Sequence, residues 1–302
     1  MRFLVNPLRK NGEWAGSEGD ESRMNIGIRL HDTLPGTLPQ RLGYARQQGF
    51  TCAHLAMSKA VPGFSMADAP RLLDEALAAQ VRADFEAQGM ECAVLGCYLN
   101  LASRDGEERE RTQAIYRAHL QFGRMIGARV IGTETNPAKG TTFAEPHWQS
   151  EEAFQLFIDC LRPVVRWAEE ADEVIAVEPV YRHIISTPER AERMLEAIPS
   201  DHLQIILDAV NLIAPEQADN ADAVIEDAIR RLGDRVRVLH MKDFTLTDGE
   251  VKACACGTGG MRYERLLALG LARDLPMTLE NTVPDNAEQA RLHLEHLASQ
   301  LK

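Results

Sequence analysis

Five apolar runs of the sequence end on an ionisable or metal-binding side chain, and these five residues are the first candidates for chemistry. A single residue of this kind is typically a solvated strand end or a salt-bridge partner. Five in succession instead indicate that the side chains converge on one place. The runs span residues 129–134, 173–178, 203–208, 236–240 and 276–280, and they end at Glu134, Glu178, Asp208, His240 and Glu280.

Three carboxylates and one imidazole form a good ligand set for a divalent cation. Glu178, Asp208, His240 and Glu280 together carry three negative charges when the carboxylates are ionised and the imidazole is neutral. Oxygen ligands dominate and one nitrogen admits transition metals, so the set suits Mn²⁺, Mg²⁺, Co²⁺ or Zn²⁺. Without a cation the carboxylates would repel and raise one another's pKa values. We therefore predict one bound divalent metal ion.

Eight short apolar runs, each followed by a longer amphipathic stretch, must position these side chains. This alternation predicts βα units, with about 35 residues for each of eight units, close to the roughly 31 of a 250-residue eightfold barrel. A doubly wound sheet is disfavoured because no glycine-rich turn follows the first run. The prediction is an α/β protein, a single-domain (β/α)8 TIM barrel over residues 24–302 after an irregular N-terminal extension over 1–23. The three runs not yet named span 24–30, 50–55 and 91–95.

Residues that typically start or end helices lie between the apolar runs. Asp68 predicts the start of a helix that Gly89 ends, Gly127 ends the next helix, and Ser150 opens a third. The sequence Thr187-Pro188-Glu189 supplies a cap, a proline at the first position and an early carboxylate. The last predicted helix spans 288–301. Because the active sites of such barrels lie at the carboxyl ends of the strands, the five strand-end side chains should share one mouth.

For most other polar residues near these strand ends, two roles are possible. His183 either binds substrate or caps the next helix, and Lys242 either binds a substrate oxygen or forms a structural ion pair with Asp243. Glu134 either lines the mouth or anchors His183 or Lys242. His54 is expected to be a buried histidine whose hydrogen bonds are satisfied.

Several segments together resemble the xylose-isomerase-like TIM barrels. Within that superfamily the chain resembles the sugar phosphate isomerase/epimerase family that includes tagatose 3-epimerase and the inosose isomerases and dehydratases. The similarity covers residues 24–302 and is strongest from Glu178 onward. The segments are Val177-Glu178-Pro179, Leu207-Asp208 with Asn211, His240-Met241-Lys242-Asp243, Gly257-Thr258-Gly259-Gly260 followed by Tyr263 and Leu266, and Leu279-Glu280-Asn281.

The resemblance implies roles for individual residues. Glu178, Asp208, His240 and Glu280 match the four ligands of the single metal ion, and Glu178 and Glu280 match the two opposed catalytic glutamates of the ketose epimerases. A metal that bridges a carbonyl and a neighbouring hydroxyl stabilises an enediolate, and a carboxylate on either face can move the carbon-bound proton. This implies a metal-dependent sugar or polyol isomerase or epimerase. The alternative is an inosose-type dehydratase, a lyase in which the same enediolate expels a β-hydroxyl.

Two positions depart from the pattern of the family. Asn211 stands where members often carry a histidine, and it can still hydrogen-bond a sugar hydroxyl. Leu246 stands where the ketose epimerases have an arginine, and it offers a substrate oxygen neither charge nor hydrogen bond. Close identity of function with tagatose 3-epimerase is therefore not expected. His183, Asn211, Lys242 and Glu134 are the predicted substrate-binding residues.

Two other functions of such a barrel are less well supported. An AP endonuclease IV-type nuclease needs a three-zinc cluster, and the corresponding places lack the additional histidines, so the chain can hold one ion but not three. A barrel that only binds a ligand, without catalysis, is the other alternative. The loops over 99–107 and 136–149 are expected to set specificity, because barrels bind substrates through variable βα loops.

Composition limits the partners. With 33 basic and 45 acidic residues among 302, the net charge of −12 argues against nucleic acid or an anionic membrane as the main partner. No segment has the roughly 20 apolar residues that span a bilayer, and the first 19 residues are unlike a signal peptide. Six cysteines are too few for a disulfide scaffold. We expect a cytoplasmic protein with a small carbohydrate or polyol substrate, either monomeric or homo-oligomeric.

Overall fold

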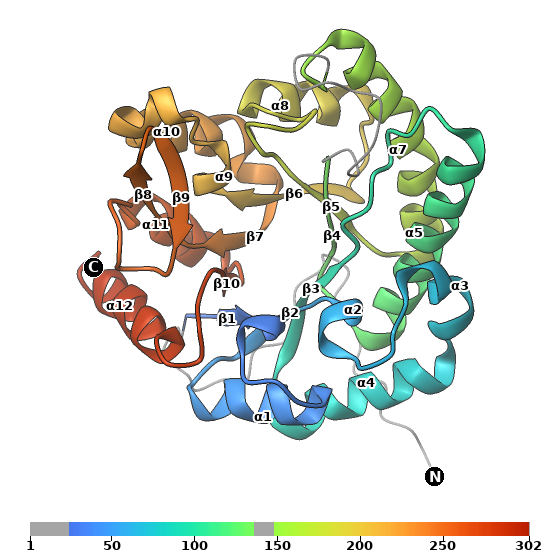
Figure 1. Cartoon of the computed structure of the whole chain (residues 1–302), viewed down its shortest axis with the longest axis horizontal. Helices are drawn as coiled ribbons and strands as arrows, with labels where there is room; N and C mark the ends of the chain where they lie inside the picture. The colour runs from blue at the N-terminus through green and yellow to red at the C-terminus, as the bar shows by residue number, and fades with distance from the viewer. Residues whose placement is uncertain (1–23, 136–147, 302) are drawn as a thin grey trace.

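Eight parallel strands close into a barrel in the computed structural model, which describes residues 24–135 and 148–301 (Figure 1). Consecutive strands are neighbours around the barrel, and β1 pairs with β10 to close it, with Ile26 opposite Met277. The prediction of a TIM barrel is confirmed. The strands are β1 (Ile26–Arg29), β2 (Cys52–Leu55), β3 (Glu91–Gly96), β4 (Ile131–Glu134), β5 (Ile175–Glu178), β6 (Leu203–Asp208), β7 (Val236–Met241) and β10 (Met277–Leu279).

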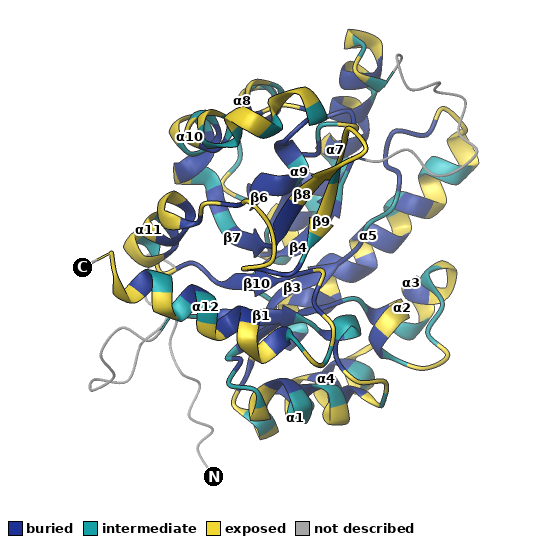
Figure 2. Cartoon of the chain, turned by 60° about the vertical axis from the view of Figure 1, so that its left-hand side comes forward, coloured by how far each residue is buried: buried dark blue, intermediate teal, exposed yellow. Residues whose placement is uncertain are grey.

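Helices surround the barrel and turn their buried faces toward the strands (Figures 1 and 2). The longest two, α5 and α7, pack side by side against the β3, β4 and β5 side of the barrel. The α-helices are α1 (Leu38–Gln47), α2 (Met57–Ala60), α3 (Ala69–Leu72), α4 (Glu75–Gln88), α5 (Gly106–Ile126), α7 (Glu151–Ala171), α8 (Pro188–Ala197), α9 (Ala209–Leu212), α10 (Ala221–Leu232), α11 (Glu264–Arg273) and α12 (Ala287–Ser299), and short 3-10 turns span Leu30–Asp32, Met66–Asp68, Pro215–Asn220 and Gly233–Arg235.

The predicted caps mostly form as expected. Ser150 accepts a hydrogen bond from Ala153 N at the start of α7, and Thr187 accepts one from Arg190 N at the start of α8. Gly127 takes the left-handed conformation that ends α5.

One predicted helix is wrong, because the stretch between Asp68 and Gly89 divides into α3 and α4. The first piece ends at Leu72, and Asp74 caps the second, where its carboxylate accepts a hydrogen bond from Leu77 N. Leu73, predicted to lie inside one continuous helix, lies at this break. A carboxylate that can accept from a free N–H competes with helix continuation.

A two-stranded antiparallel hairpin, which the sequence prediction did not include, follows β7. It pairs β8 (Asp243–Thr247) with β9 (Glu250–Cys254) through a turn at Asp248 and Gly249, both at positive φ. Figure 2 shows the hairpin standing away from the end of the barrel. At the side of the mouth, Arg182 of the β5–α8 loop forms an ion pair with Glu250 of the hairpin.

The core has two parts. A small apolar cluster fills the inside of the barrel, with Val94, Ala176, Ile206 and Val238 among its members, and a larger one lies between the strands and the helices. Parallel strands covered on both faces in this way explain why the runs read as continuously apolar. Within residues 24–135 and 148–301, no helix is long and apolar enough to cross a membrane. The predicted extension over 1–23 and most of the predicted specificity loop over 136–149 lie outside the described residues.

Candidate active site and metal centre

The strand-end residues meet at one end of the barrel because the strands are parallel and in register. Asp208 of β6 lies opposite His240 of β7, and Glu134 of β4 lies opposite Glu178 of β5. Glu280 follows β10 directly. Glu178, Asp208, His240 and Glu280 are all buried, so the fold holds three carboxylates and an imidazole away from bulk water.

One ring nitrogen of His240 lies close to both glutamates. Its Nδ1 atom is 3.2 Å from Glu178 Oε2 and 3.4 Å from Glu280 Oε1. The ligand atoms of Glu178, Asp208 and His240 all lie within 4.8 Å of one another, which is a spacing that one cation can bridge. His240 Nε2 is buried and has no hydrogen-bond partner among the described residues.

Lys242, the residue that follows β7, joins the cluster. Its Nζ atom lies 2.7 Å from Asp208 Oδ2 and 3.5 Å from Glu280 Oε2. The alternative of a Lys242–Asp243 ion pair is wrong, because the Asp243 carboxylate accepts four backbone hydrogen bonds instead. Lys242 therefore neutralises part of the negative charge of the site.

Asn211 connects three members of the cluster. Its side-chain Nδ2 donates to Glu178 Oε1 at 2.6 Å, and its Oδ1 accepts from Lys242 Nζ at 2.9 Å. Its backbone N donates to Asp208 Oδ1 at 3.1 Å, since Asp208 is also the N-cap of the short helix α9. The amide thus fixes the orientation of one glutamate and of the lysine.

Glu280 has further partners on the side of β1. Arg29, the last residue of β1, lies 3.3 Å from Glu280 Oε2 through one guanidinium nitrogen and donates two hydrogen bonds to Asp32 at 3.1 Å. Asp32 thereby holds the guanidinium in place against Glu280. Sequence reasoning did not single out Arg29, although its position at the end of the first strand was available as a signal.

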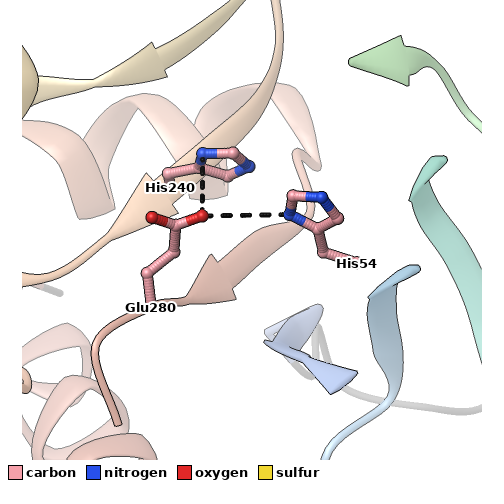
Figure 3. Close-up of side chains that lie close together, drawn as sticks. All are labelled: His54, His240 and Glu280. Carbon is pink, nitrogen blue, oxygen red and sulfur yellow. Dashed lines mark ion pairs between the residues drawn. The ribbon is translucent and has the colours of Figure 1, made fainter. Parts of the chain in front are cut away.

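His54 lies beside Glu280 at the end of β2, and Figure 3 shows its ring next to that of His240. Its Nδ1 atom is 3.8 Å from Glu280 Oε1. The expectation that His54 is a satisfied core histidine is wrong, because neither ring nitrogen has a hydrogen-bond partner among the described residues. Its place at a strand end was the signal that the sequence offered.

Glu134 and His183 lie at the edge of the site. The carboxylate of Glu134 approaches His183 Nδ1 to 3.8 Å, in line with the expected anchoring of His183. His183 is buried, and Glu134 retains some solvent exposure. The structure thus brings Lys242 and Asn211 into the central cluster and leaves Glu134 and His183 beside it.

Comparison with known proteins gives the family. The model of the xylose isomerase-like TIM barrel family matches residues 42–300. The chain belongs to this family. Among curated protein sequences, none matches significantly.

Solved structures of similar fold include proteins described as sugar epimerases. A 3-keto-D-glucoside 4-epimerase from E. coli superposes with a TM-score of 0.70 at 18% identity, over 91% of this chain and 100% of the other. A D-tagatose 3-epimerase-like protein gives 0.71 at 17% identity, over 92% and 98%. The IolI protein with a bound zinc atom gives 0.67 at 16% identity, over 92% and 98%. These likenesses show the shared fold.

Burial and close charges shift the pKa values of the cluster. Burial raises the pKa of Asp208 to about 6, although Lys242 opposes the shift. Burial lowers the pKa of His240, but the carboxylates of Glu280 and Glu178 outweigh it and raise that pKa to about 9. Burial likewise raises the pKa of Glu280, yet His240, Lys242 and Arg29 hold it well below its ordinary value. The charges are therefore strongly interdependent.

The residues fit a divalent cation on chemical grounds. Three carboxylates and an imidazole are the donor types that Mn²⁺, Mg²⁺, Co²⁺ or Zn²⁺ accept, and all four side chains are buried. Glu178, Asp208 and His240 form one group of closely spaced ligand atoms, and Glu280 joins His240 and His54 in a second group that shares His240. Lys242 and a protonated His240 supply positive charge there, which a bound cation could supply instead.

Tyr98, which the sequence prediction did not include, lies two residues after β3. Its hydroxyl is buried without a hydrogen-bond partner among the described residues. Burial raises the pKa of the phenol well above its ordinary value, and the charges of Glu178 and Glu280 raise it further. The phenol therefore keeps its proton and can act as a hydrogen-bond donor. A lone tyrosine after a strand gives no signal in the sequence that separates it from a core residue.

Proposed function

We propose that this protein is a metal-dependent isomerase or epimerase of a small sugar, polyol ketone or inosose. The observation that carries the proposal is the position of His240 Nδ1 close to both Glu178 and Glu280, 3.2 and 3.4 Å from the two carboxylates. The two glutamates come from β5 and β10, which β6 and β7 separate around the barrel. A substrate carbon bound next to His240 would lie near both carboxylates, and the proposal requires that they face it from opposite sides.

The chemistry follows from this placement. One carboxylate removes the proton from the carbon next to a carbonyl, which gives an enediolate, and a carboxylate then returns a proton. Return from the opposite face to the same carbon inverts that centre, and return to the neighbouring carbon isomerises the substrate. Asn211 Nδ2 restrains Glu178 Oε1, and Arg29 and Lys242 restrain Glu280 Oε2, so both carboxylates are oriented in advance.

The metal ligands in this proposal are Glu178, Asp208, His240 and Glu280. A bound divalent cation would supply Lewis acidity toward the substrate carbonyl and a neighbouring hydroxyl. His183, Asn211, Lys242 and Glu134 are the proposed substrate-binding residues. The zinc in the IolI structure, at 16% identity, supports a metal of this kind in the fold without identifying which one acts here.

The charge of the mouth favours an uncharged substrate. The carboxylates of Glu134, Glu178, Asp208 and Glu280 face the cationic side chains of Lys242 and Arg29, and a divalent cation would balance the remainder. With these charges balanced, the mouth has no surplus of positive charge to attract a phosphate or carboxylate on the substrate. The same argument, with the net charge of −12, disfavours a nucleic acid. A cytoplasmic location and the choice between monomer and homo-oligomer stay predictions.

Deuterium exchange tests the reaction. The protein loaded in turn with Mn²⁺, Mg²⁺, Co²⁺ or Zn²⁺ is incubated in D₂O with D-tagatose, D-fructose and 2-keto-myo-inositol, and NMR follows the carbon next to the carbonyl. We expect deuterium to enter at that carbon for at least one substrate. Accumulation of a dehydration product without exchange would favour the dehydratase, in which the enediolate expels a β-hydroxyl.

Metal analysis separates the enzyme from a barrel that only binds a ligand. We expect about one divalent ion per chain, lost in Glu178→Gln and in Asp208→Asn, because each variant removes a charged ligand. Glu170→Gln on α7, where the side chain is exposed, serves as the matched control and should keep the ion. Failure of the unaltered protein to take up any of the four metals would refute the proposed site.

A further inference from the structure

His54 and Tyr98 form a second group of polar side chains next to the metal residues. The two rings come from β2 and from the segment after β3, and their centroids lie 5.6 Å apart. His54 is 2% exposed, and both of its ring nitrogens lack a hydrogen-bond partner among residues 24–135 and 148–301. The hydroxyl of Tyr98 is also buried and also lacks a hydrogen-bond partner among these residues. Buried polar groups are almost always paired, so these three atoms require an explanation.

Two glycines allow these side chains to lie where they do. A Cβ atom at Gly96 would lie 2.9 Å from His54 Nε2 and 2.8 Å from Tyr98 Cε2, and a Cβ atom at Gly132 would lie 3.0 Å from the Tyr98 hydroxyl. Contacts under 3.0 Å are essentially never found for real Cβ atoms, so Gly96 in β3 leaves room for both rings. At Gly132 in β4 a Cβ atom would also lie 2.7 Å from Val94 and 2.9 Å from Ile206, so this glycine serves the packing of the barrel interior as well as the Tyr98 hydroxyl.

The main alternative is that His54 binds the metal. Ligand atoms of His54, His240 and Glu280 lie within 4.8 Å of one another, which would suit an ion. However, the rings of His54 and His240 stack, with centroids 5.3 Å apart and planes inclined by 16°. Two imidazoles that bind one ion must both direct an in-plane nitrogen lone pair at it. Stacked rings with nearly parallel planes hold their lone pairs in separate planes, which is an unfavourable arrangement for sharing one ion.

No protein atom of residues 24–135 and 148–301 satisfies these three polar atoms, and a ligand atom from solution can do so. We propose that His54 and Tyr98 form a subsite that binds one uncharged oxygen, a hydroxyl or a carbonyl, of a polyhydroxy ketone placed over His240. The inference rests on the proposed function and names the part of the substrate that this chain recognises. A phenol donates to such an oxygen, and a neutral imidazole can donate with one nitrogen and accept with the other, which suits a hydroxyl.

The position of the subsite agrees with this role. His54 Nδ1 lies 3.8 Å from Glu280 Oε1, so a substrate oxygen bound there is next to one of the two glutamates proposed to move a proton. Figure 3 shows that the rings of His54 and His240 lie on one side of the Glu280 carboxylate. The subsite would thus hold the substrate against that carboxylate. Both residues would touch the substrate without binding the cation.

Four variants test the subsite. Tyr98→Phe removes the hydroxyl, His54→Leu removes both nitrogens, and His54→Gln keeps one amide near the place of Nε2. Tyr44→Phe is the matched control, since the Tyr44 hydroxyl donates to Pro284 O away from the site. Calorimetry measures the affinity of the Mn²⁺-loaded proteins for D-tagatose, D-fructose and 2-keto-myo-inositol, and separately the affinity of each protein for Mn²⁺ alone.

We expect Tyr98→Phe and His54→Leu each to weaken binding of the best ketose about ten-fold or more, as loss of a buried hydrogen bond predicts. His54→Gln should recover part of the affinity, and Tyr44→Phe should change none of it. The affinity for Mn²⁺ should stay within about two-fold in all four variants. A second measurement needs no variant: the ¹⁵N resonances of the His54 ring should shift when the ketose is added.

Three results would overturn the subsite. The first is an unchanged ketose affinity in folded Tyr98→Phe and His54→Leu, together with an unmoved His54 ring resonance. The second is loss of Mn²⁺ binding in His54→Leu. The third is that the unaltered protein binds none of the ketoses. The proposed function fails separately. If the unaltered protein exchanges deuterium but the variants keep their ketose affinity, the subsite alone is rejected. If ketose binding depends on Tyr98 but no deuterium enters the ketose, the reaction alone is rejected.

Discussion

At the scale of single residues, Lys242 and a divalent cation compete for the same carboxylates. Lys242 Nζ lies 2.7 Å from Asp208 Oδ2 and 3.5 Å from Glu280 Oε2, all of them buried. Removing one partner of a buried ion pair costs about 3–5 kcal/mol, because an uncompensated charge stays behind. In EDTA, Lys242→Met should therefore unfold at least roughly 5 °C below the unaltered protein. Differential scanning calorimetry measures this directly.

Added metal should reverse that loss. With excess Mn²⁺ the unfolding temperature of Lys242→Met should rise more than that of the unaltered protein, since the cation replaces the missing ammonium group. Lys59→Met is the matched control, because Lys59 is exposed on α2, and it should unfold with the unaltered protein in both buffers. Equal unfolding temperatures of Lys242→Met and the unaltered protein in EDTA would show that Lys242 does not balance these carboxylates.

The place of a residue in the site could be predicted from the sequence only where the strand order alone determines its neighbours. Glu178, Asp208, His240 and Glu280 each end an apolar run, and parallel strands place such residues together whatever the loops do. His54 could not be assigned in this way, because whether a buried ring is satisfied depends on Glu280 and on residues of other strands. Tyr98 depends in addition on the glycines that make room for it.

At the scale of elements, Asp243 fixes the base of the β8–β9 hairpin to the loop that precedes α11. Its two carboxylate oxygens accept hydrogen bonds of 2.8 to 3.0 Å from the backbone N–H groups of Phe244, Gly257, Gly259 and Met261. A Cβ atom at Gly259 would lie 2.1 Å from Phe244 O, so this approach requires glycine. Asp243 is also next to Lys242, whose position the hairpin base must preserve.

Asp243→Asn should loosen this junction. The amide retains one acceptor oxygen and turns an NH₂ group toward backbone donors, which leaves buried N–H groups unpaired. We expect a loss of about 2–3 kcal/mol in the free energy of unfolding by urea, and faster hydrogen exchange at Gly257 and Gly259. Asp248→Asn, at the exposed tip of the hairpin, should change stability by less than about 0.5 kcal/mol. Equal stability of the two variants would contradict the role of Asp243.

The elements themselves were predictable where periodicity was strong. The eight barrel strands and the caps at Ser150 and Thr187 follow from apolar runs and from side chains that accept N–H groups. The hairpin was missed, although Asp248-Gly249 between two alternating segments is the usual signal of a tight turn. The break at Asp74 was missed because an aspartate can either cap a new helix or lie within a continuing one, and the sequence does not show which prevails.

At the scale of the whole molecule, the two ends of the barrel use buried acids differently. At the mouth, the carboxylates face cationic partners and each other. Glu173 instead precedes β5 at the opposite end of the barrel, where it is 5% exposed and its Oε1 accepts a hydrogen bond from Val174 N. Burial raises the pKa of Glu173 to about 7. This carboxyl therefore links global stability to pH, at a place remote from the proposed metal.

The direction of that link follows from proton binding. Since the pKa of Glu173 is higher in the folded chain than its ordinary 4.5, the folded state binds this proton more tightly, and its contribution to stability falls as pH rises from about 4.5 to about 7. Above that window the buried charge costs up to about 3 kcal/mol.

Glu173→Gln should therefore gain stability relative to the unaltered protein as pH rises from 5 to 8, in urea unfolding. Glu170→Gln, exposed near the end of α7, should show no such trend. A constant difference between Glu173→Gln and the unaltered protein across this range would mean that Glu173 is not protonated preferentially in the folded state.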